Sequence, residues 1–273
     1  GTKFSYEMER MELLGKDEPC LILMNHTCFQ DMEVAYRIMF PRPMNIVASN
    51  DGFIGFFGLM EWLMRTIGCI PTQKFVSDVR LVKDMDYCFK TLKSSVLMYP
   101  EASYTFDGTA TPLPDTLGKC LKLLKVPVVM ISTQAAFLHD PLYNGLQLRK
   151  VPVRATMRYL LSPADIEQRT VAELNEILKE QFTFDGFRYQ REAGIRVTEP
   201  FRADGLNRVL YKCPACGAEG HMEGKGTQLT CRACGKVWTL NELGALEAED
   251  GHPLFDHVPD WYAWERDEVK KEI

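Results

Sequence analysis

Short apolar segments that alternate with helical patterns are the feature that most constrains the fold of this chain. Runs of this kind are typical of strands buried on both faces of a parallel sheet. They occur at Cys20–Met24, Asn45–Ser49, Ser95–Tyr99 and Val126–Ser132, with a later strand expected at Val151–Leu161. Helical periodicity covers Asp31–Phe40, Gly52–Gly68, Ser77–Leu92, Thr116–Lys125 and Val171–Gln181, with Thr170 as the N-cap of the last. This order predicts an α/β fold, a mostly parallel sheet flanked by helices on both faces.

Composition and charge limit the classes of function. Apolar residues make up 46% of the 273 residues and charged residues 25%, which excludes a mainly disordered chain. No apolar run reaches the ~18–20 residues that span a bilayer. Residues 1–208 carry equal numbers of basic and acidic side chains. A neutral body of this kind argues against nucleic-acid binding, which depends on many contacts of Lys and Arg with phosphates.

Cysteine and charge distribution divide the chain into three parts. We expect an α/β domain over 1–208, a cysteine-rich module over 209–240 and an acidic C-terminal tail over 241–273, which holds ten acidic and three basic residues. The tail is expected to be a solvated segment or a repulsive rim, except that the aromatic residues of Asp260–Glu265 should pack on the module or the body. His252 and His257 are assigned no chemical role. Nine cysteines without a regular disulfide pattern fit a reducing compartment, so we expect a cytoplasmic protein.

The first polar motif follows the strand Cys20–Met24 directly. It contains His26 and, five residues later, Asp31. On one helix these residues would lie about 140° apart and could not meet. If His26 lies in the loop and Asp31 in the first helical turn, the carboxylate can orient the imidazole for proton transfer. From the spacing alone, a loop histidine beside a helix N-terminal aspartate is the favoured interpretation.

The second motif follows the strand Ser95–Tyr99 and runs from Tyr99 to Gly108. Glu101 lies just past the end of the strand, where it could orient a polar substrate. On its own, the segment also fits a Pro-Glu turn with a solvent-facing carboxylate.

The order of these motifs resembles the glycerolipid acyltransferase family, whose best-known members are the lysophosphatidic acid acyltransferases. The family motif NHxxxxD is matched by Asn25-His26…Asp31, and FPEGTRSxDG by Tyr99 through Gly108. Two further motifs are matched by Gly68–Lys74 and by Val126–Val129. Pro114 and Gly118 match the P-x-x-x-G pattern that usually follows the motif at Tyr99–Gly108. The resemblance covers about residues 1–160.

The resemblance implies transfer of an acyl group from acyl-CoA or acyl-acyl carrier protein to a glycerolipid hydroxyl. It makes His26 the catalytic base and Asp31 the residue that orients it. Cys28 is not assigned as a nucleophile, because the family has no cysteine there. Residues expected to bind the substrate are Lys74, Glu101, Ser103 and Tyr104.

This sequence departs from the family at the acceptor-binding positions. Lys74 and Tyr104 replace two arginines, which in phosphate-accepting members are expected to hold the acceptor phosphate, and Ala102 replaces a glycine. Lysine keeps the charge but loses the bidentate fork, and tyrosine keeps only a neutral donor. We expect a lysophospholipid acceptor, 1-acylglycerol-3-phosphate first. An acceptor without a phosphate monoester, such as a glycolipid or a zwitterionic lysolipid, is the alternative.

The segment Phe53–Ile67 is strongly apolar and lies between two of these motifs. It fits either a core helix or a monotopic helix that contacts the membrane through Phe53, Phe56, Phe57 and Trp62. The second interpretation places the protein peripherally at the inner face of the cell membrane.

Two CxxCG turns mark the cysteine-rich module. Cys213 and Cys216 form the first pair, and Cys231 and Cys234 the second. This pattern resembles a zinc ribbon, in which four thiolates complete a tetrahedral, structural Zn²⁺ site with no open position. Because zinc ribbons also bind proteins or nucleic acids, a binding protein is the rival to an enzyme.

Overall fold

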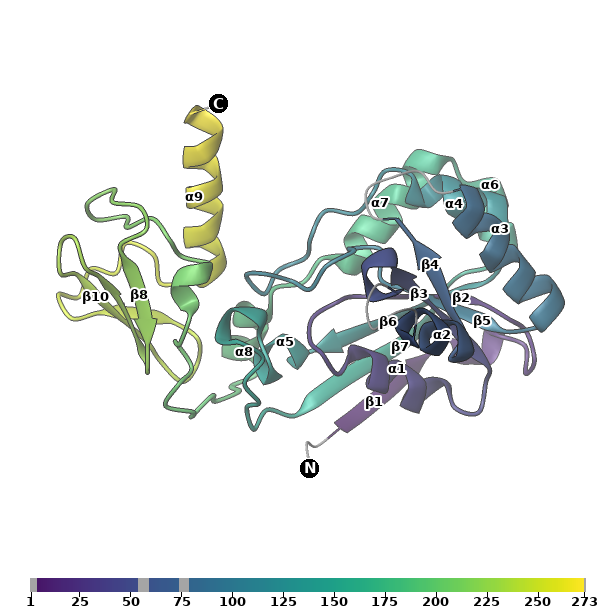
Figure 1. Cartoon of the computed structure of the whole chain (residues 1–273), viewed down its shortest axis with the longest axis horizontal. Helices are drawn as coiled ribbons and strands as arrows, with labels where there is room; N and C mark the ends of the chain where they lie inside the picture. Colours follow the sequence, from purple (N-terminus) through teal and green to yellow (C-terminus); the bar gives the residue numbers. More distant parts are fainter. Residues whose placement is uncertain (1–3, 54–58, 74–78, 273) are drawn as a thin grey trace.

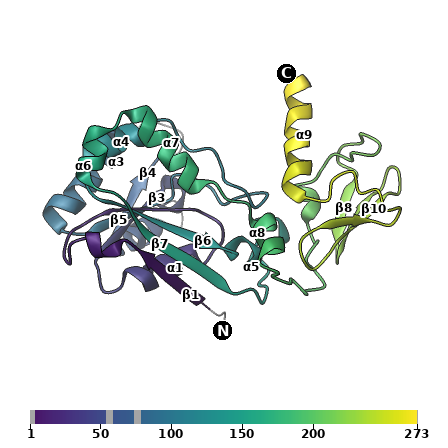
Figure 2. The ribbon, with the colours of Figure 1, turned by 180° about the vertical axis from the view of Figure 1, so that it is seen from behind.

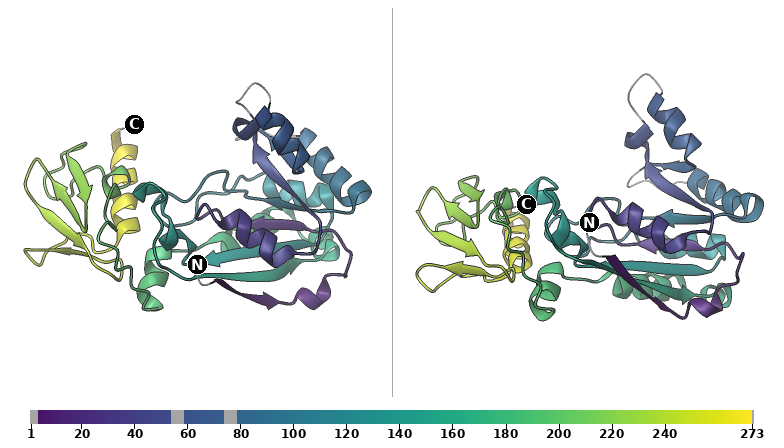
Figure 3. Two further views of the ribbon diagram at one scale, coloured as in Figure 1. Left: turned by 60° about the horizontal axis from the view of Figure 1, so that its bottom comes forward. Right: turned by 90° about the horizontal axis from the view of Figure 1, so that it is seen from below.

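The protein is described by a computed structural model that covers residues 4–53, 59–73 and 79–272. It contains a large α/β body and a smaller part with its own sheet, residues 209–272, which we call the C-terminal module (Figure 1). Helix α9 lies between the small sheet and the body (Figure 3). In the described part of the chain, none of the helices is both long and apolar enough to cross a bilayer.

The body is organised around a seven-stranded sheet with the order β1-β7-β6-β2-β5-β3-β4. Its neighbouring strands are parallel except for β6 and β7, so the predicted mostly parallel α/β fold is confirmed. The strands are β1 (Phe4–Glu9), β2 (Leu21–Met24), β3 (Met44–Ser49), β4 (Cys69–Thr72), β5 (Ser95–Met98), β6 (Val128–Gln134) and β7 (Val153–Leu161).

Successive side chains along a strand of the sheet pack into two separate cores, one on each face. Leu21 and Leu23 of β2 belong to one core, and Ile22 and Met24 to the other, as the two-residue period of a strand requires. The first core is covered by four helices that gather over one face (Figure 2): α3 (Val79–Tyr87), α4 (Leu117–Leu124), α6 (Pro163–Gln168) and α7 (Val171–Phe182). The second core is covered by α1 (Asp31–Met39).

Helix ends follow the sequence signals where these are strong. Thr170 accepts a hydrogen bond from the backbone of Glu173, whose carboxylate accepts one from Thr170, so the expected N-cap is confirmed as a full capping box. Ser162 and Asp165 form a second capping box at the start of α6. Single turns of other helix types occur at Met11–Leu13, Asn50–Phe53, Cys88–Leu92, Leu142–Asn144 and Leu206–Arg208.

The described part of the apolar segment Phe53–Ile67 does not lie in the core, which was one of its two interpretations. Its described part contains helix α2 (Leu59–Thr66), and residues 54–58, with Phe56 and Phe57, lie outside the described residues. Leu59 and Trp62 are 61% and 62% exposed. The core interpretation is therefore wrong for α2.

The acidic segment 241–273 is not a solvated tail, contrary to expectation. It adds strand β11 (Leu246–Ala248) to the small antiparallel sheet and ends in α9 (Val258–Glu272). Trp261 of α9 is fully buried, with its ring 4.8 Å from that of Trp238, so the expected packing of the tail aromatics is confirmed. The other strands of this sheet are β8 (Met222–Lys225), β9 (Gln228–Cys231) and β10 (Val237–Leu240).

The module shares a third core with the end of the body. Phe137 of α5 (Ala136–His139) and Phe187 of α8 (Gly186–Glu192) belong to the same buried cluster as Trp238 and Trp261. This common core attaches the module to the body. The division of the chain at residue 208 stays a prediction.

Candidate active site and metal centre

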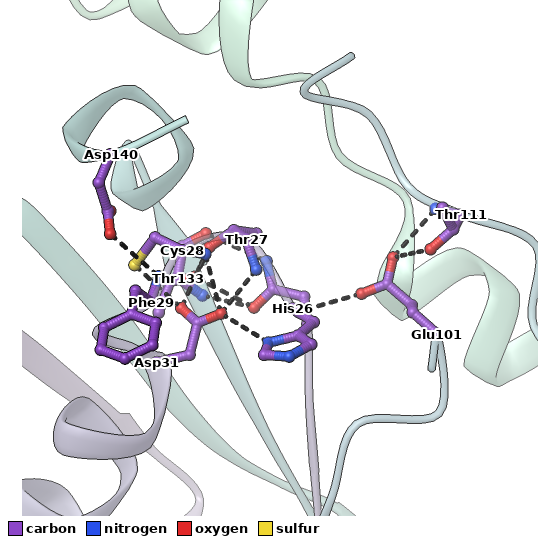
Figure 4. A network of polar contacts seen from close by, with 10 residues as sticks. His26, Thr27, Cys28, Phe29, Asp31, Glu101, Thr111, Thr133 and Asp140 are labelled. Carbon is purple, nitrogen blue, oxygen red and sulfur yellow. Dashed lines mark hydrogen bonds and ion pairs between the residues drawn. The ribbon is translucent and has the colours of Figure 1, made fainter. Parts of the chain in front are cut away.

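The structure brings His26 and Asp31 together in the manner that their spacing requires. His26 lies in the loop after β2, and Asp31 is the first residue of α1. The Nδ1 atom of His26 lies 3.1 Å from Oδ2 of Asp31 (Figure 4). The His26 side chain is 20% exposed, whereas that of Asp31 is fully buried. Solvent can therefore reach the imidazole but not the carboxylate behind it.

The Asp31 carboxylate is held by the loop that it closes. Its Oδ2 atom accepts hydrogen bonds from the backbone N–H groups of Thr27, at 2.6 Å, and Cys28, at 3.0 Å. Oδ1 accepts from the Thr27 hydroxyl at 3.2 Å. Asp31 also lies in the first turn of α1, where the helix dipole favours negative charge. These contacts fix the carboxylate that faces His26.

Asn25 ties the same loop to the neighbouring strand β6. Its side-chain Oδ1 accepts from the backbone N–H of Thr133 at 2.8 Å, and its Nδ2 donates to the carbonyl of Thr133 at 3.3 Å. The hydroxyls of Thr27 and Thr133 lie 2.9 Å apart. The asparagine side chain thus continues the ladder of the sheet beyond the end of β2.

Glu101 is buried and holds protein groups with both of its carboxylate oxygens. Oε2 accepts from the backbone N–H of His26 at 2.8 Å (Figure 4), and Oε1 accepts from the backbone and hydroxyl of Thr111 at 3.0 and 2.8 Å. Burial raises the pKa of Glu101, and these hydrogen bonds oppose the rise. The contacts support a role in positioning His26, and the expected contact with substrate stays a prediction.

Two tyrosine rings pack against the imidazole of His26. The ring of Tyr99 lies 4.2 Å from it, centroid to centroid, and the ring of Tyr104 lies 3.9 Å from it. Tyr104 was expected at the site, but sequence reasoning missed Tyr99, which ends the apolar run of β5 and looked like a core residue. The buried hydroxyl of Tyr99 finds no hydrogen-bond partner among the described residues. Tyr99 therefore contacts His26 through its aromatic ring, and its hydroxyl makes no hydrogen bond to a described residue.

Other residues near the loop have simpler roles. Cys28 is 1% exposed, and burial followed by the charge of Asp31 raises the pKa of its thiol, which disfavours a nucleophilic thiolate. Asp140, which sequence reasoning also missed, accepts from the backbone N–H of Phe29 at 3.1 Å. Ser103 is exposed, and Lys74 lies outside the described residues.

A pocket of about 260 Å³ borders the far side of the loop. Thr27 of the loop and Thr133 of β6 line it on one side, and Phe137, Asp185 and Arg188 line it from α5 and the start of α8. His26 and Asp31, which we call the dyad, are not among its lining residues, so the pocket adjoins the dyad without containing it.

The dyad is arranged for proton transfer. Because Nδ1 of His26 is hydrogen-bonded to Asp31, Nε2 is the nitrogen that can face a substrate. No described residue hydrogen-bonds to Nε2. The carboxylate favours the tautomer with the proton on Nδ1 and stabilises the imidazolium that forms when Nε2 takes a proton.

Four cysteine sulfurs of the C-terminal module form a compact cluster. The Sγ atoms of Cys213, Cys216, Cys231 and Cys234 all lie within 4.8 Å of one another. Cys213 and Cys234 are 3.8 Å apart, as are Cys216 and Cys231. A tetrahedral metal with bonds of about 2.3 Å to sulfur needs sulfur–sulfur distances of about 3.8 Å. The cluster therefore fits a four-coordinate metal ion.

One comparison with known proteins covers the segment that holds His26 and Asp31. Residues 5–134, which include Asn25, His26, Asp31 and Glu101, match the family model described as Acyltransferase. One similar solved structure is that of the 1-acyl-sn-glycerophosphate (LPA) acyltransferase PlsC from Thermotoga maritima. It is 17% identical, with a TM-score of 0.46, over 65% of this chain and 69% of that chain. A search of curated proteins finds no match. The matched part of the α/β body, residues 5–134, is similar to the acyltransferase family.

Proposed function

We propose that this protein transfers a fatty acyl group from a thioester to a hydroxyl of a lysolipid, with His26 as general base. The observation that carries the proposal is the hydrogen bond between Asp31 and Nδ1 of His26, which leaves Nε2 available. Nε2 takes the proton of the acceptor hydroxyl as its oxygen attacks the thioester carbonyl. The new C–O bond forms, the C–S bond breaks, and the departing sulfur takes the proton back from His26. No acyl-enzyme is needed, and the buried Cys28 takes no part.

The donor in this proposal is acyl-CoA or acyl-acyl carrier protein, and the first acceptor is 1-acylglycerol-3-phosphate. Lys74 supplies the charge for the acceptor phosphate. Replacing Lys74 by Met should raise KM for this acceptor by about tenfold, the equivalent of ~1.4 kcal/mol, whereas Lys74→Arg should retain it. Lys119→Met, which removes an exposed charge from α4, is the control.

A second acceptor class is favoured by the position of Tyr104. Its neutral ring lies against His26 where the family resemblance places a phosphate-binding arginine. An acceptor without a phosphate monoester, such as a glycolipid or a zwitterionic lysolipid, needs no second cation there. An unchanged KM in the Lys74→Met variant, with a wild-type preference for such an acceptor, would decide for this class.

Replacing His26 by Ala tests the reaction itself. Loss of a positioned base should lower kcat by ~10²–10⁴-fold. Activity is measured by mass spectrometry of products formed from an acyl donor and mixed lysolipids. His252→Ala, which removes an exposed histidine of the module, should have wild-type activity. Near-normal turnover by His26→Ala would refute the mechanism, whereas a wild type that forms no product would favour a binding protein.

The proposal includes a peripheral location at the cytoplasmic face of the membrane. The exposed apolar residues of α2 support it, because an enzyme that takes lipids from a bilayer needs an apolar contact surface. We also propose that the four cysteines hold a structural Zn²⁺ ion in a zinc ribbon. Four thiolates leave no position for a reacting water, so the metal supplies folding free energy to the module rather than chemistry.

A further inference from the structure

The backbone of His26 is held by the segment that follows β5. We call residues 101–111 the catalytic loop. Besides the contact of Glu101 with the N–H of His26, the backbone N–H of Thr105 donates to the carbonyl of His26 at 2.8 Å. Glu101 in turn binds Thr111, so both ends of the loop are connected through this carboxylate. The position of the loop therefore determines the position of the proposed base.

The catalytic loop is itself bound to the start of α8. The backbone N–H of Gly186 donates to the carbonyl of Gly108 at 2.7 Å, and Thr109 forms an isolated β-bridge with Asp185. The packing is tight here, because a Cβ atom at Gly108 would lie 2.6 Å from the ring of Phe137. A shift of α8 would therefore be transmitted to the loop.

The C-terminal module, residues 209–272, contacts both of these segments. Nε2 of the nearly buried His257 lies 3.2 Å from a carboxylate oxygen of Asp185, whose other oxygen caps α8 by accepting from the N–H of Arg188 at 2.8 Å. The ring of Tyr262 in α9 lies 5.9 Å from that of Phe106 in the catalytic loop. The module thus contacts the loop directly through Phe106 and indirectly through Asp185.

The same helix is joined to the cysteine cluster. Nε1 of Trp261 donates to the carbonyl of Lys212 at 3.0 Å, and the N–H of Lys212 donates to the buried carboxylate of Glu265 at 2.8 Å. Lys212 directly precedes Cys213, one of the four sulfur ligands. A metal ion that orders the cysteine turns would therefore also order the part of α9 that contacts the catalytic loop.

We propose that the metal-loaded module is a positioning element of the active site, with His257 and Tyr262 as the residues that transmit its effect to the catalytic loop. This inference rests on the proposed function, because the role of the loop is to hold the base. It gives the metal an influence on turnover although the cysteine cluster is separate from the dyad. His257, to which the sequence assigned no chemical role, becomes a positioning residue.

The test compares two contacts between the module and α8. His257→Gln breaks the pair with Asp185, which leads to the loop. Asp256→Asn breaks the pair with Arg191, 3.2 Å apart, which joins the same helix without contacting the loop. Hydrogen exchange of the amides of residues 105–111, kcat and KM for a lysolipid, and zinc content are measured in the full chain. Tyr262→Ala and zinc removal by a chelator complete the set.

We expect His257→Gln and Tyr262→Ala to keep the metal, to speed exchange in residues 105–111 by about tenfold, and to lower kcat by about tenfold with KM little changed. Chelation should act in the same direction, and Asp256→Asn should resemble the wild type. Unchanged exchange in His257→Gln and Tyr262→Ala, or an equal effect of Asp256→Asn, would overturn the proposal. If exchange responds as expected while the wild type acylates no lysolipid, the positioning role stands and the proposed function fails.

Discussion

At the scale of the residue, the site is defined by the four side chains that contact His26. Asp31 fixes its Nδ1 atom, Glu101 fixes its backbone, and the rings of Tyr99 and Tyr104 pack against its imidazole. A planar cation packed against aromatic rings gains cation–π stabilisation, so this arrangement favours the imidazolium that proton transfer creates. The two tyrosines are therefore expected to act through their rings.

Replacing Tyr104 separates stacking from hydrogen bonding. Tyr104→Phe keeps the ring and should retain kcat, whereas Tyr104→Leu should lower it by about fivefold or more, since a cation–π contact contributes ~1 kcal/mol or more. Steady-state kinetics with one lysolipid acceptor measure both. Equal losses in the two variants would show that the hydroxyl contacts the substrate, as the sequence led us to expect.

Ala102 adopts a left-handed backbone conformation, with φ at 59°. That conformation costs an L-residue ~1–2 kcal/mol, and glycine avoids the cost. Ala102→Gly should therefore stabilise the protein by about 1 kcal/mol, or ~2–4 °C in Tm. Ala172→Gly in the exposed face of α7 is the control and should destabilise by about 0.5–1 kcal/mol. A Tm lowered in both variants would contradict the strain at Ala102.

At the scale of the element, what the sequence could predict depended on burial. The apolar runs of β2, β5 and β6 were found because both faces of these strands are buried. Strand β1 was missed because its sequence, FSYEME, contains no apolar run. None of its residues is fully buried, so the strand does not need one. The pairing of His26 with Asp31 was one of two interpretations of their spacing, and the family resemblance selected it. The stacking of Tyr99 and Tyr104 could not be predicted, because it depends on how the catalytic loop folds back over β5.

Helix α2 presents an apolar face that the rest of the described structure leaves uncovered. Leu59 and Trp62 are more than half exposed, and Leu63 and Ile67 are 43% and 49% exposed. Replacing Leu59 and Trp62 by Ser should weaken liposome binding by at least tenfold in a flotation assay, because burial of each side chain contributes ~1.5–3 kcal/mol. Leu123→Ser on α4, where the side chain is 69% exposed, should have no effect. Flotation that is unchanged by the α2 replacements would contradict a membrane contact there.

At the scale of the whole molecule, three cores divide the stability of the chain. Among the described residues, those that form the two cores of the central sheet all lie at or before Phe182 in the chain. The third core joins α5 and α8 to the module and includes the buried Cys213 and Cys231. Loss of the module should therefore loosen the end of the body that carries α8 and leave the central sheet folded.

Removal of the metal tests this division. Elemental analysis should give about one zinc ion per chain, since four thiolates complete one tetrahedral site. Cys213→Ser should lose the metal, and limited proteolysis should then cut residues 209–240 first while a fragment with the central sheet persists. Cys120→Ser, which changes a thiol outside the cluster, is the control. A zinc-free wild type with unchanged resistance to protease near residue 220 would refute the metal site.

The pairing of β1 with β7 has a consequence for synthesis on the ribosome. Glu9 of β1 bonds Arg158 of β7, 149 positions later in the chain. At ~5–20 residues per second, the ribosome takes about 7–30 s to make the residues that separate them. During that time β1 has no strand to pair with, although β2 and the His26 loop are already outside. The nascent chain therefore presents an unpaired strand to chaperones until β7 emerges, and the sheet can be completed only after Leu161 has been made.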